Sequence, residues 1–362
     1  QTPVLLIGSI VILVVGLIKI GGWGELVTIA QANITDQGDD MLKLVRSADD
    51  PVFPWTGVLF ASPIIGFWYW CTDQFIVQRV LSGRNQKEAR RGTIFGAYLK
   101  LLPVFIFLIP GIIAYAMQRK GMLQLDDPDA AFPTLVSTLL PAGMKGVVVG
   151  GLVAALMSSL ASLFNSSATL FTVDFYKKYR PDASERHLVQ VGRIATASVV
   201  VLGVLWIPVM RNMGQVLYVY LQDVQSLLSP GIAAVFLLGV FWKGATAAGG
   251  LAGLVVGFVL GMLRLMLRVF ERELDPNGIV YQVVVAPNWL HYCIFLFLLS
   301  LAVIWVVSKF TPDPSRKMIE GLTYGSASPA QIAETRASWN LWDVVHSMVV
   351  ISVVVAFYAY FW

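Results

Sequence analysis

The chain contains nine runs of apolar residues, each long enough to cross a lipid bilayer as an α-helix. The hydrocarbon core of a bilayer is spanned by about 20 apolar residues in helical form. Hydrophobic residues make up 57% of the 362 positions, charged residues only 13%, and the mean hydropathy is +0.71. The sequence therefore predicts an all-α polytopic membrane protein with spans near residues 2–20, 54–78, 94–117, 144–172, 191–210, 215–241, 245–267, 286–308 and 340–361.

The loops between these runs carry unequal numbers of basic residues. When alternate loops are assigned to opposite sides of the membrane, one side holds 15 Lys and Arg and the other holds nine. Short loops rich in Lys and Arg stay in the cytoplasm. This predicts a multi-pass protein of the plasma or inner membrane, with the Gln1 side cytoplasmic and the Trp362 side extracellular or periplasmic.

The sequence lacks the usual signatures of an enzyme or of a metal centre. Its two cysteines and three histidines are scattered, and no phosphate-binding glycine loop, nucleophile elbow or zinc motif is present. The net charge of +4 follows from the loop asymmetry and does not indicate binding to nucleic acid. We therefore expect no catalytic residue and no cofactor, with the lipid bilayer as one partner and the oligomeric state open.

Polar residues inside the spans are costly and mark candidate functional positions. In the fourth run, small and hydroxyl residues recur at helical spacing on one face. Such a stripe is typical of close helix packing. Hydroxyl and carbonyl oxygens are also the ligands that a hard cation such as sodium prefers. Both interpretations stay open for the stripe, which comprises Ala155, Ser158, Ser159, Ser162, Asn165, Ser166 and Thr169.

The second run contains two aromatic residues one turn from a carboxylate. Tyr69, Trp70 and Asp73 share a helical face in this pattern. Aromatic residues at this depth are usually packing or interface residues. A flat apolar face beside a hydrogen-bond acceptor also suits a sugar ring. Lys100, in the middle of the third run, either pairs with Asp73 or reaches a substrate hydroxyl.

Two other runs contain proline or glycine at positions that affect the helix backbone. In the sixth run, three polar residues (Gln222, Asp223 and Gln225) precede Ser229-Pro230-Gly231, which predicts an irregular stretch or a kink. In the seventh run, glycines recur every four residues from Gly249 to Gly261, which predicts a ridge for close helix packing.

Several segments in order resemble one known family, the solute:sodium symporters, and within it the sodium/glucose cotransporter branch. The matching segments are WYWCTDQ with FIVQRVLSGRN (residues 68–85), GAYLKLLPVF (96–105), ALMSSLASLFNSSATLFTVDFY (155–176), GRIA (192–195) and SPGIAAVFLLGVFWK (229–243). The resemblance extends over almost the whole chain.

The resemblance implies a LeuT-like transporter fold of two inverted five-helix repeats with additional peripheral helices. It implies one membrane domain over residues 1–362. Within it, residues 1–30 resemble the last helix of the first repeat, residues 54–241 the complete second repeat, and residues 245–362 peripheral helices. The four helices that precede this part in the family are expected to be missing, including the unwound first core helix.

The resemblance also implies ion-binding positions. Ser158 and Ser159 match the hydroxyls of the main sodium site, and Ala155 matches a position whose backbone carbonyl binds the same ion. Ser162 matches a position of a second sodium site in some members. Sodium is thus the expected coupling ion.

Substrate positions follow in the same way from the resemblance. Tyr69 matches an inner-gate aromatic that stacks on the sugar, with Trp70 beside it, and Lys100 matches a hydrogen-bonding position. Gly66 stands where sugar-binding members have Thr or Asn, which favours a bulkier sugar or inositol. The full set comprises Gly66, Tyr69, Trp70, Asp73, Lys100 and Gln222.

The function that the resemblance implies is sodium-coupled symport of a hexose or polyol by alternating access. Proton coupling at Asp73 is a second choice. Two alternatives remain: symport of a non-sugar solute such as an amino acid, a carboxylate or inositol, and a sensor that does not transport.

Overall fold

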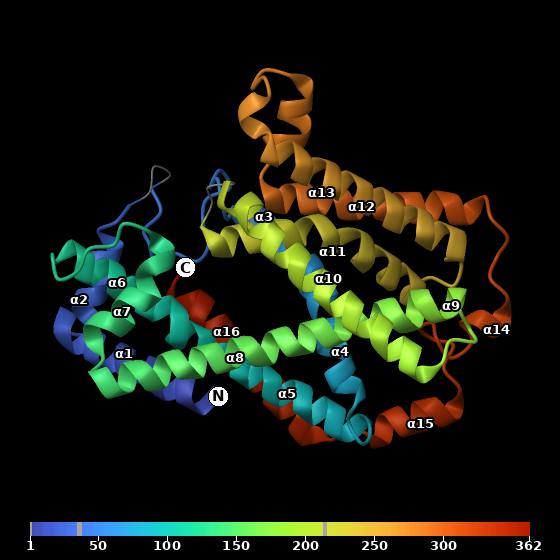
Figure 1. Ribbon diagram of the computed structural model, residues 1–362, viewed down its shortest axis with the longest axis horizontal. Coiled ribbons are helices and arrows are strands. Elements are labelled where there is room, and N and C mark those ends of the chain that lie inside the picture. The colour runs from blue at the N-terminus through green and yellow to red at the C-terminus, as the bar shows by residue number, and fades with distance from the viewer. Residues whose placement is uncertain (1, 35–37, 213–215) are drawn as a thin grey trace. The chain divides into compact units, whose positions relative to one another are not determined.

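The computed structural model describes residues 2–34, 38–212 and 216–362, and these residues form helices without a β-strand (Figure 1). The chain divides into two compact units. The first comprises Gln1–Leu42 and Gly96–Arg211, and the second comprises Lys43–Phe95 and Asn212–Trp362. Helix α5 (Gln86–Pro103) contributes residues to both units.

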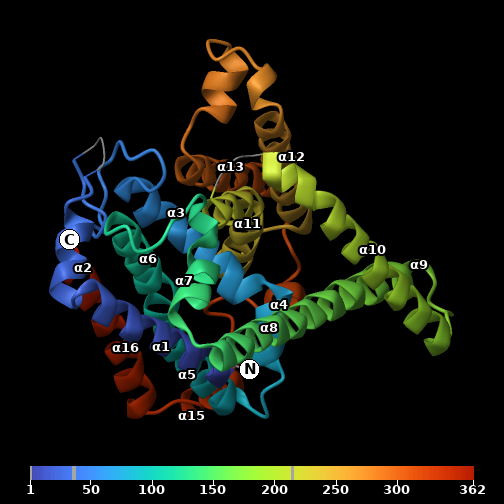
Figure 2. The same cartoon turned by 60° about the vertical axis from the view of Figure 1, so that its left-hand side comes forward.

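The core of the first unit lies where α1 packs against α6, α7 and α8. Ile12 of α1, Ile113 of α6, Leu135 of α7 and Val148 of α8 are buried together there. Figure 2 shows α1 and α8 crossing. The elements of this unit are α1 (Thr2–Ile20), α2 (Trp23–Gln31), π-helical η2 (Val104–Leu108), α6 (Ile109–Arg119), η3 (Pro128–Ala130), α7 (Ala131–Leu139), α8 (Ala142–Thr169), π-helical η4 (Leu170–Tyr176), α9 (Lys177–Tyr179) and α10 (Glu185–Asn212).

The first expected span, near residues 2–20, is helix α1, and a sharp bend joins α1 to the short helix α2 that follows. Gly21 and Gly22 have φ angles of 106° and 100°, which residues with a side chain rarely adopt, and α1 and α2 meet there at 77°. The Nζ of Lys120 donates to the Ile20 carbonyl oxygen at 2.7 Å and pairs with Glu25 at 2.8 Å. A cation thus satisfies a carbonyl at the end of α1 that has no partner within the helix.

The second unit is built around three closely packed helices, α11, α12 and α13, which lie side by side in Figures 1 and 2. Its elements are α3 (Trp55–Phe67), π-helical η1 (Trp68–Thr72), α4 (Gln74–Leu81), α11 (Leu217–Phe241), α12 (Ala247–Val269), η5 (Glu271–Glu273), π-helical η6 (Tyr281–Val285), α13 (Trp289–Lys309), α14 (Arg316–Ile319), α15 (Pro329–Ala337) and α16 (Leu341–Tyr360).

The glycines of α12 pack against both neighbouring helices. A methyl group added at Gly249 or Gly253 would meet Ser308 or Ile304 of α13. At Gly257 or Gly261 it would meet the backbone of α11. The predicted packing ridge is therefore confirmed, and it serves two partners.

Seven helices of the described residues are long and apolar enough to cross a membrane, or eight if the bent pair counts as one span. Sequence analysis predicted nine. The predicted span that is not among them is the second, expected at 54–78. It is interrupted because the backbone of Asp73 is extended (φ −69°, ψ 120°) and separates η1 from α4. The prediction of an irregular stretch before Pro230 was wrong, because α11 is helical without a break from Leu217 to Phe241.

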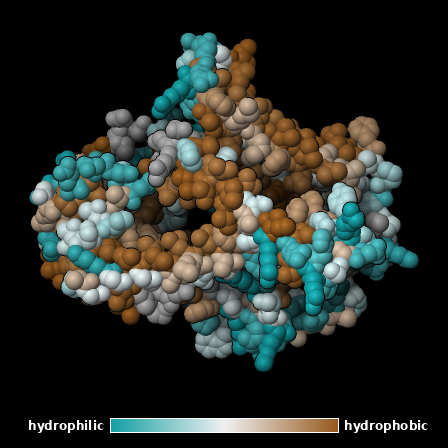
Figure 3. Space-filling view, in the orientation of Figure 1, coloured by the Kyte–Doolittle hydropathy of each residue, from teal (hydrophilic) through white to brown (hydrophobic). Residues whose placement is uncertain are grey.

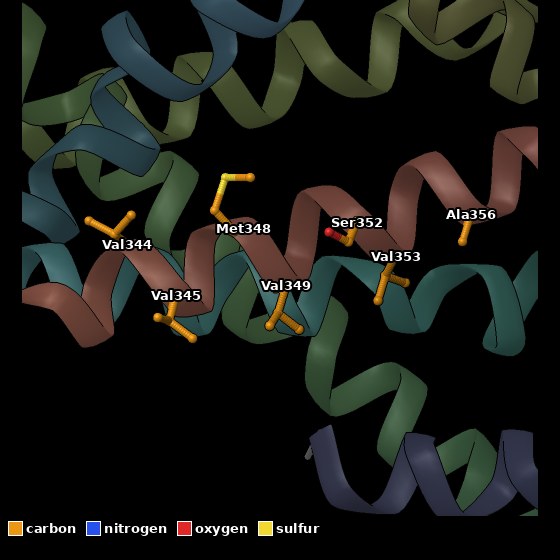
Figure 4. A pocket seen from close by; sticks show the side chains of 7 residues that line it. All are labelled: Val344, Val345, Met348, Val349, Ser352, Val353 and Ala356. Atoms are coloured by element: carbon orange, nitrogen blue, oxygen red, sulfur yellow. The ribbon is translucent and has the colours of Figure 1, made fainter.

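Hydrophobic side chains cover much of the helix surfaces in Figure 3, whereas hydrophilic ones gather at helix ends and connecting segments. The last helix, α16, is the most exposed of the candidate membrane spans. Only 6% of its most apolar stretch is buried, compared with 39% for α11. Figure 4 shows seven of its residues, from Val344 to Ala356, which line a shallow groove. Hydrogen bonds hold segments at either end of α16: Arg90 donates to Ser338, and the Leu44 N–H donates to the Phe361 carbonyl oxygen.

Candidate functional site

The break at Asp73 is the most unusual backbone feature among the predicted site residues. The Asp73 carboxylate accepts a hydrogen bond of 2.9 Å from the Phe75 N–H and so caps α4. Before the break, the Trp68 carbonyl oxygen accepts from the Asp73 N–H at 3.1 Å and from the Thr72 hydroxyl at 2.7 Å. A widened turn followed by a helix start is typical of functional segments of membrane helices.

The two predicted aromatic residues lie in this widened turn. The rings of Tyr69 and Trp70 meet edge to face, with centroids 5.1 Å apart. Tyr69 is half-buried, whereas Trp70 is 47% exposed. The pair therefore presents an aromatic surface next to the carboxylate that caps α4.

The space beside Gly66 is open. A methyl group added there would have no heavy atom within 4 Å. Helix α11, which carries the half-buried Gln222, packs against α3 and η1. Four predicted substrate residues (Gly66, Tyr69, Trp70 and Asp73) lie on the short stretch from the end of α3 to the break that follows η1. The helix that carries a fifth, Gln222, packs against this stretch.

The predicted sodium residues lie on one continuous helix of the first unit, α8. Ser158 and Ser159 are exposed, whereas Ala155 and Ser162 are half-buried. The Ser162 hydroxyl donates to the Ser158 carbonyl oxygen at 3.1 Å. The oxygens suit a hard cation, but a single helix face encloses no ion, so further ligands must come from another segment.

Lys100 is exposed and lies in the part of α5 that belongs to the first unit. The predicted site residues therefore form two sets, one in each unit, and each set is described by itself. Among the described residues, no cluster of three or more His, Cys, Asp or Glu side chains could hold a metal ion. The groove along α16 is lined almost entirely by apolar side chains and offers no converging polar groups for a solute (Figure 4).

A buried charged cluster in the second unit was missed by sequence analysis. It joins Asp223 of α11, Arg264 and Arg268 of α12, and Tyr292 of α13. The sequence contained a signal for it, because the two arginines lie four residues apart at the end of an apolar run and therefore need a partner on one face.

Beyond the end of α12, the Tyr281 hydroxyl donates a hydrogen bond to the Glu271 carboxylate at 3.1 Å. This bond and the negative charge of Glu271 raise the pKa of the Tyr281 phenol.

These features describe a class of protein: a multi-pass helical membrane protein with interrupted spans and polar residues inside the apolar segments. The sequence profile of the sodium:solute symporter family matches residues 1–257. The chain belongs to this family, whose members are transporters and not enzymes.

Curated relatives agree with this assignment, and a solved structure agrees with the fold. The chain is 35% identical to a sodium/mannose cotransporter of Bos taurus, over 100% of the chain and 66% of that protein. It is also 35% identical to sodium/myo-inositol cotransporter 2 of Rattus norvegicus, over 90% of the chain and 52% of that protein. A sodium-coupled sialic acid symporter in its substrate-bound outward-open state matches with a TM-score of 0.64 and 22% identity, over 86% of the chain and 61% of that structure. The predicted LeuT-like helical fold is confirmed. The chain spans about half to two thirds of the length of these proteins.

Proposed function

We propose that this chain forms part of a sodium-coupled symporter for a sugar or polyol. The proposal is carried by the hydroxyl stripe of α8 in a chain that belongs to the family, because the sequence resemblance aligns this stripe with the family's sodium positions. The relatives named for mannose and myo-inositol support a polyhydroxylated substrate. The open space at Gly66 supports a bulky one.

Each residue set has a defined role in this proposal. The hydroxyls of Ser158 and Ser159 and the carbonyl oxygen of Ala155 bind sodium, and Ser162 contributes to a second ion position. Tyr69 and Trp70 offer an aromatic face to the sugar ring. Hydrogen bonds to the sugar hydroxyls come from Asp73, Lys100 and Gln222. Flat aromatic faces and a few polar groups together suit a ligand that is apolar on its faces and polar at its edges.

Sodium supplies the driving force in this mechanism. Sodium binding favours the outward-open state with a formed pocket, and substrate binding then favours closure and opening to the inside. Each sodium ion that enters releases about 2.3 kcal/mol per 100 mV of membrane potential. That energy supports accumulation of the substrate by a few tens-fold, since about 1.4 kcal/mol corresponds to tenfold. The loop charges support a cytoplasmic position for the Gln1 side, although Gln1 itself lies outside the described residues.

The test is uptake of labelled substrates into proteoliposomes that contain the natural protein bearing this chain, with and without an inward sodium gradient. Glucose, galactose, mannose and myo-inositol form the panel, and proline is the non-sugar comparison. The proposal predicts gradient-driven uptake of at least one sugar or polyol. Uptake of proline alone would instead establish the non-sugar alternative, and no uptake of any solute would favour a sensor.

A single substitution tests the proposed sodium site. Ser159→Ala removes one proposed sodium ligand and is expected to raise the sodium concentration for half-maximal uptake about tenfold, because an oxygen ligand is lost. Ser167→Ala is the matched control, since it removes the same hydroxyl from α8 about two turns beyond Ser159 and about 80° away from it around the helix. An unchanged sodium dependence in the Ser159 variant would refute the ion-site assignment.

A further inference from the structure

The outer surfaces of α11, α12 and α13 are apolar, but a charged cluster is buried where the three helices meet. Asp223 is 2% exposed and Arg264 is 1% exposed. A charge that is removed from water costs several kcal/mol unless it is paired, so the cluster needs compensating interactions.

Those interactions connect all three helices. Asp223 of α11 forms an ion pair and a hydrogen bond with Arg268 of α12. Arg264, one turn earlier on α12, donates to the Pro287 carbonyl oxygen at 2.6 Å, and its guanidinium lies 4.1 Å from the ring centroid of Tyr292 on α13. One oxygen of Asp223 and two nitrogens of Arg264 are buried without a partner among the described residues.

Backbone contacts at the same interface fix the register of α11 against α12. A methyl group added at Gly257 would lie 3.0 Å from the Gly231 Cα. One added at Gly261 would overlap the Leu227 carbonyl oxygen. Leu227 lies one turn after Asp223 on the same buried face. The ion pair therefore lies one turn from this tight backbone contact, on the same face of α11.

The rotation of α11 matters because Gln222 precedes Asp223 directly. Consecutive residues of an α-helix point about 100° apart. When Asp223 is held towards α12, the direction of the half-buried Gln222 is therefore determined as well.

We propose that Asp223 and Arg268 are positioning residues that aim the Gln222 amide at the substrate. This inference rests on the proposed function, because it assigns Asp223 a role that acts through Gln222. The two residues do not contact the substrate. The loss of their ion pair lets α11 rotate, and the hydrogen bond from Gln222 to the substrate is weakened.

The experiment measures KM and kcat of sodium-driven uptake by the natural protein bearing this chain, with the better transported of mannose and myo-inositol. Asp223→Asn and Arg268→Gln are each made in the native background and in a Gln222→Ala background. Arg272→Gln is the matched control, because it removes an exposed arginine one turn beyond Arg268. If Asp223→Asn does not fold, Asp223→Glu replaces it, since that variant keeps the charge but moves it by one methylene group.

The expected result is that Asp223→Asn and Arg268→Gln each raise KM about three- to tenfold, which corresponds to the loss of one hydrogen bond. In the Gln222→Ala background the same changes are expected to add less than about twofold. The sodium concentration for half-maximal uptake at saturating substrate stays unchanged, and Arg272→Gln leaves KM unchanged.

Three results would overturn the inference. One is an equal rise in KM in both backgrounds, and a second is a lower yield of folded protein with an unchanged KM. The third is an unchanged KM for Gln222→Ala itself, which would also remove Gln222 from the substrate site. In all three cases sodium-driven uptake would persist, so these failures are distinguishable from a failure of the proposed symport, in which no sugar or polyol is taken up.

Discussion

Gly261 of α12 lies against the backbone of α11, and we predict that Gly261→Ala destabilises the second unit. The added methyl group would overlap the Leu227 carbonyl oxygen and lie 3.1 Å from its carbonyl carbon. Because these are main-chain atoms in the middle of a helix, they do not rotate away as a side chain would. The two helices must separate, or α11 must bend.

The size of the effect follows from two opposing terms. Overpacking a close interface costs about 1–3 kcal/mol, and a backbone obstacle places this site at the upper end. Replacing a helical glycine by alanine stabilises the folded state by up to about 1 kcal/mol, because alanine has the higher helix propensity. The net loss is therefore about 2 kcal/mol, which corresponds to a fall in Tm of about 3 °C for a chain of this size.

The assay is thermal unfolding of the purified protein in detergent, with Gly250→Ala as the matched control. Gly250 is on the same helix, and a methyl group added there would make only an ordinary contact of 3.7 Å with Val235. The control is therefore expected to keep or slightly raise the Tm. An unchanged Tm for Gly261→Ala would refute the inference that backbone contact sets the spacing of α11 and α12.

Two further changes test local structure. Lys120→Gln is expected to cost about 0.5–1 kcal/mol, because it removes the cation that bonds the Ile20 carbonyl at the end of α1. A Tm equal to that of the unsubstituted protein would show that the contact is not stabilising. Asp73→Ala is expected to cost about 1 kcal/mol through loss of the cap on the Phe75 N–H. Asp73→Asn keeps an accepting oxygen and should keep the Tm, so equal losses in both variants would contradict the capping role.

The sequence predicted the helical class, most of the spans and the packing of α12, because long apolar runs and a four-residue glycine repeat are direct consequences of bilayer thickness and helix geometry. Gly249 and Gly253 pack against side chains of α13, as their spacing indicates. The partner of each glycine was not predictable, since one helix sequence does not specify which neighbour approaches which face.

The position of the helix break was predicted in the wrong span. Pro230 and the polar residues before it predicted an irregular stretch, yet α11 is helical through them. Asp73 is a weaker signal, yet the helix stops there because its carboxylate offers the Phe75 N–H an alternative to the helical bond. The ion pair between Asp223 and Arg268 joins residues 45 positions apart, so the sequence indicates that the arginines need a partner but only the tertiary fold identifies it. The sodium and substrate residues came from family resemblance, and their roles stay predictions.

The interruption at Asp73 also has a consequence for how the protein is made. Helix α3 (13 residues) continues directly into η1 (5 residues), so the helical segment before the break is at most roughly 27 Å long and only just approaches the thickness of the hydrocarbon core of a bilayer. Its packing partners α11 and α13 follow more than 140 residues later in the chain. During synthesis, α3 therefore lacks its packing partners until the late helices have been made. Changes at the α11–α12–α13 contacts should thus impair biogenesis of the early segments as well as the stability of the finished protein.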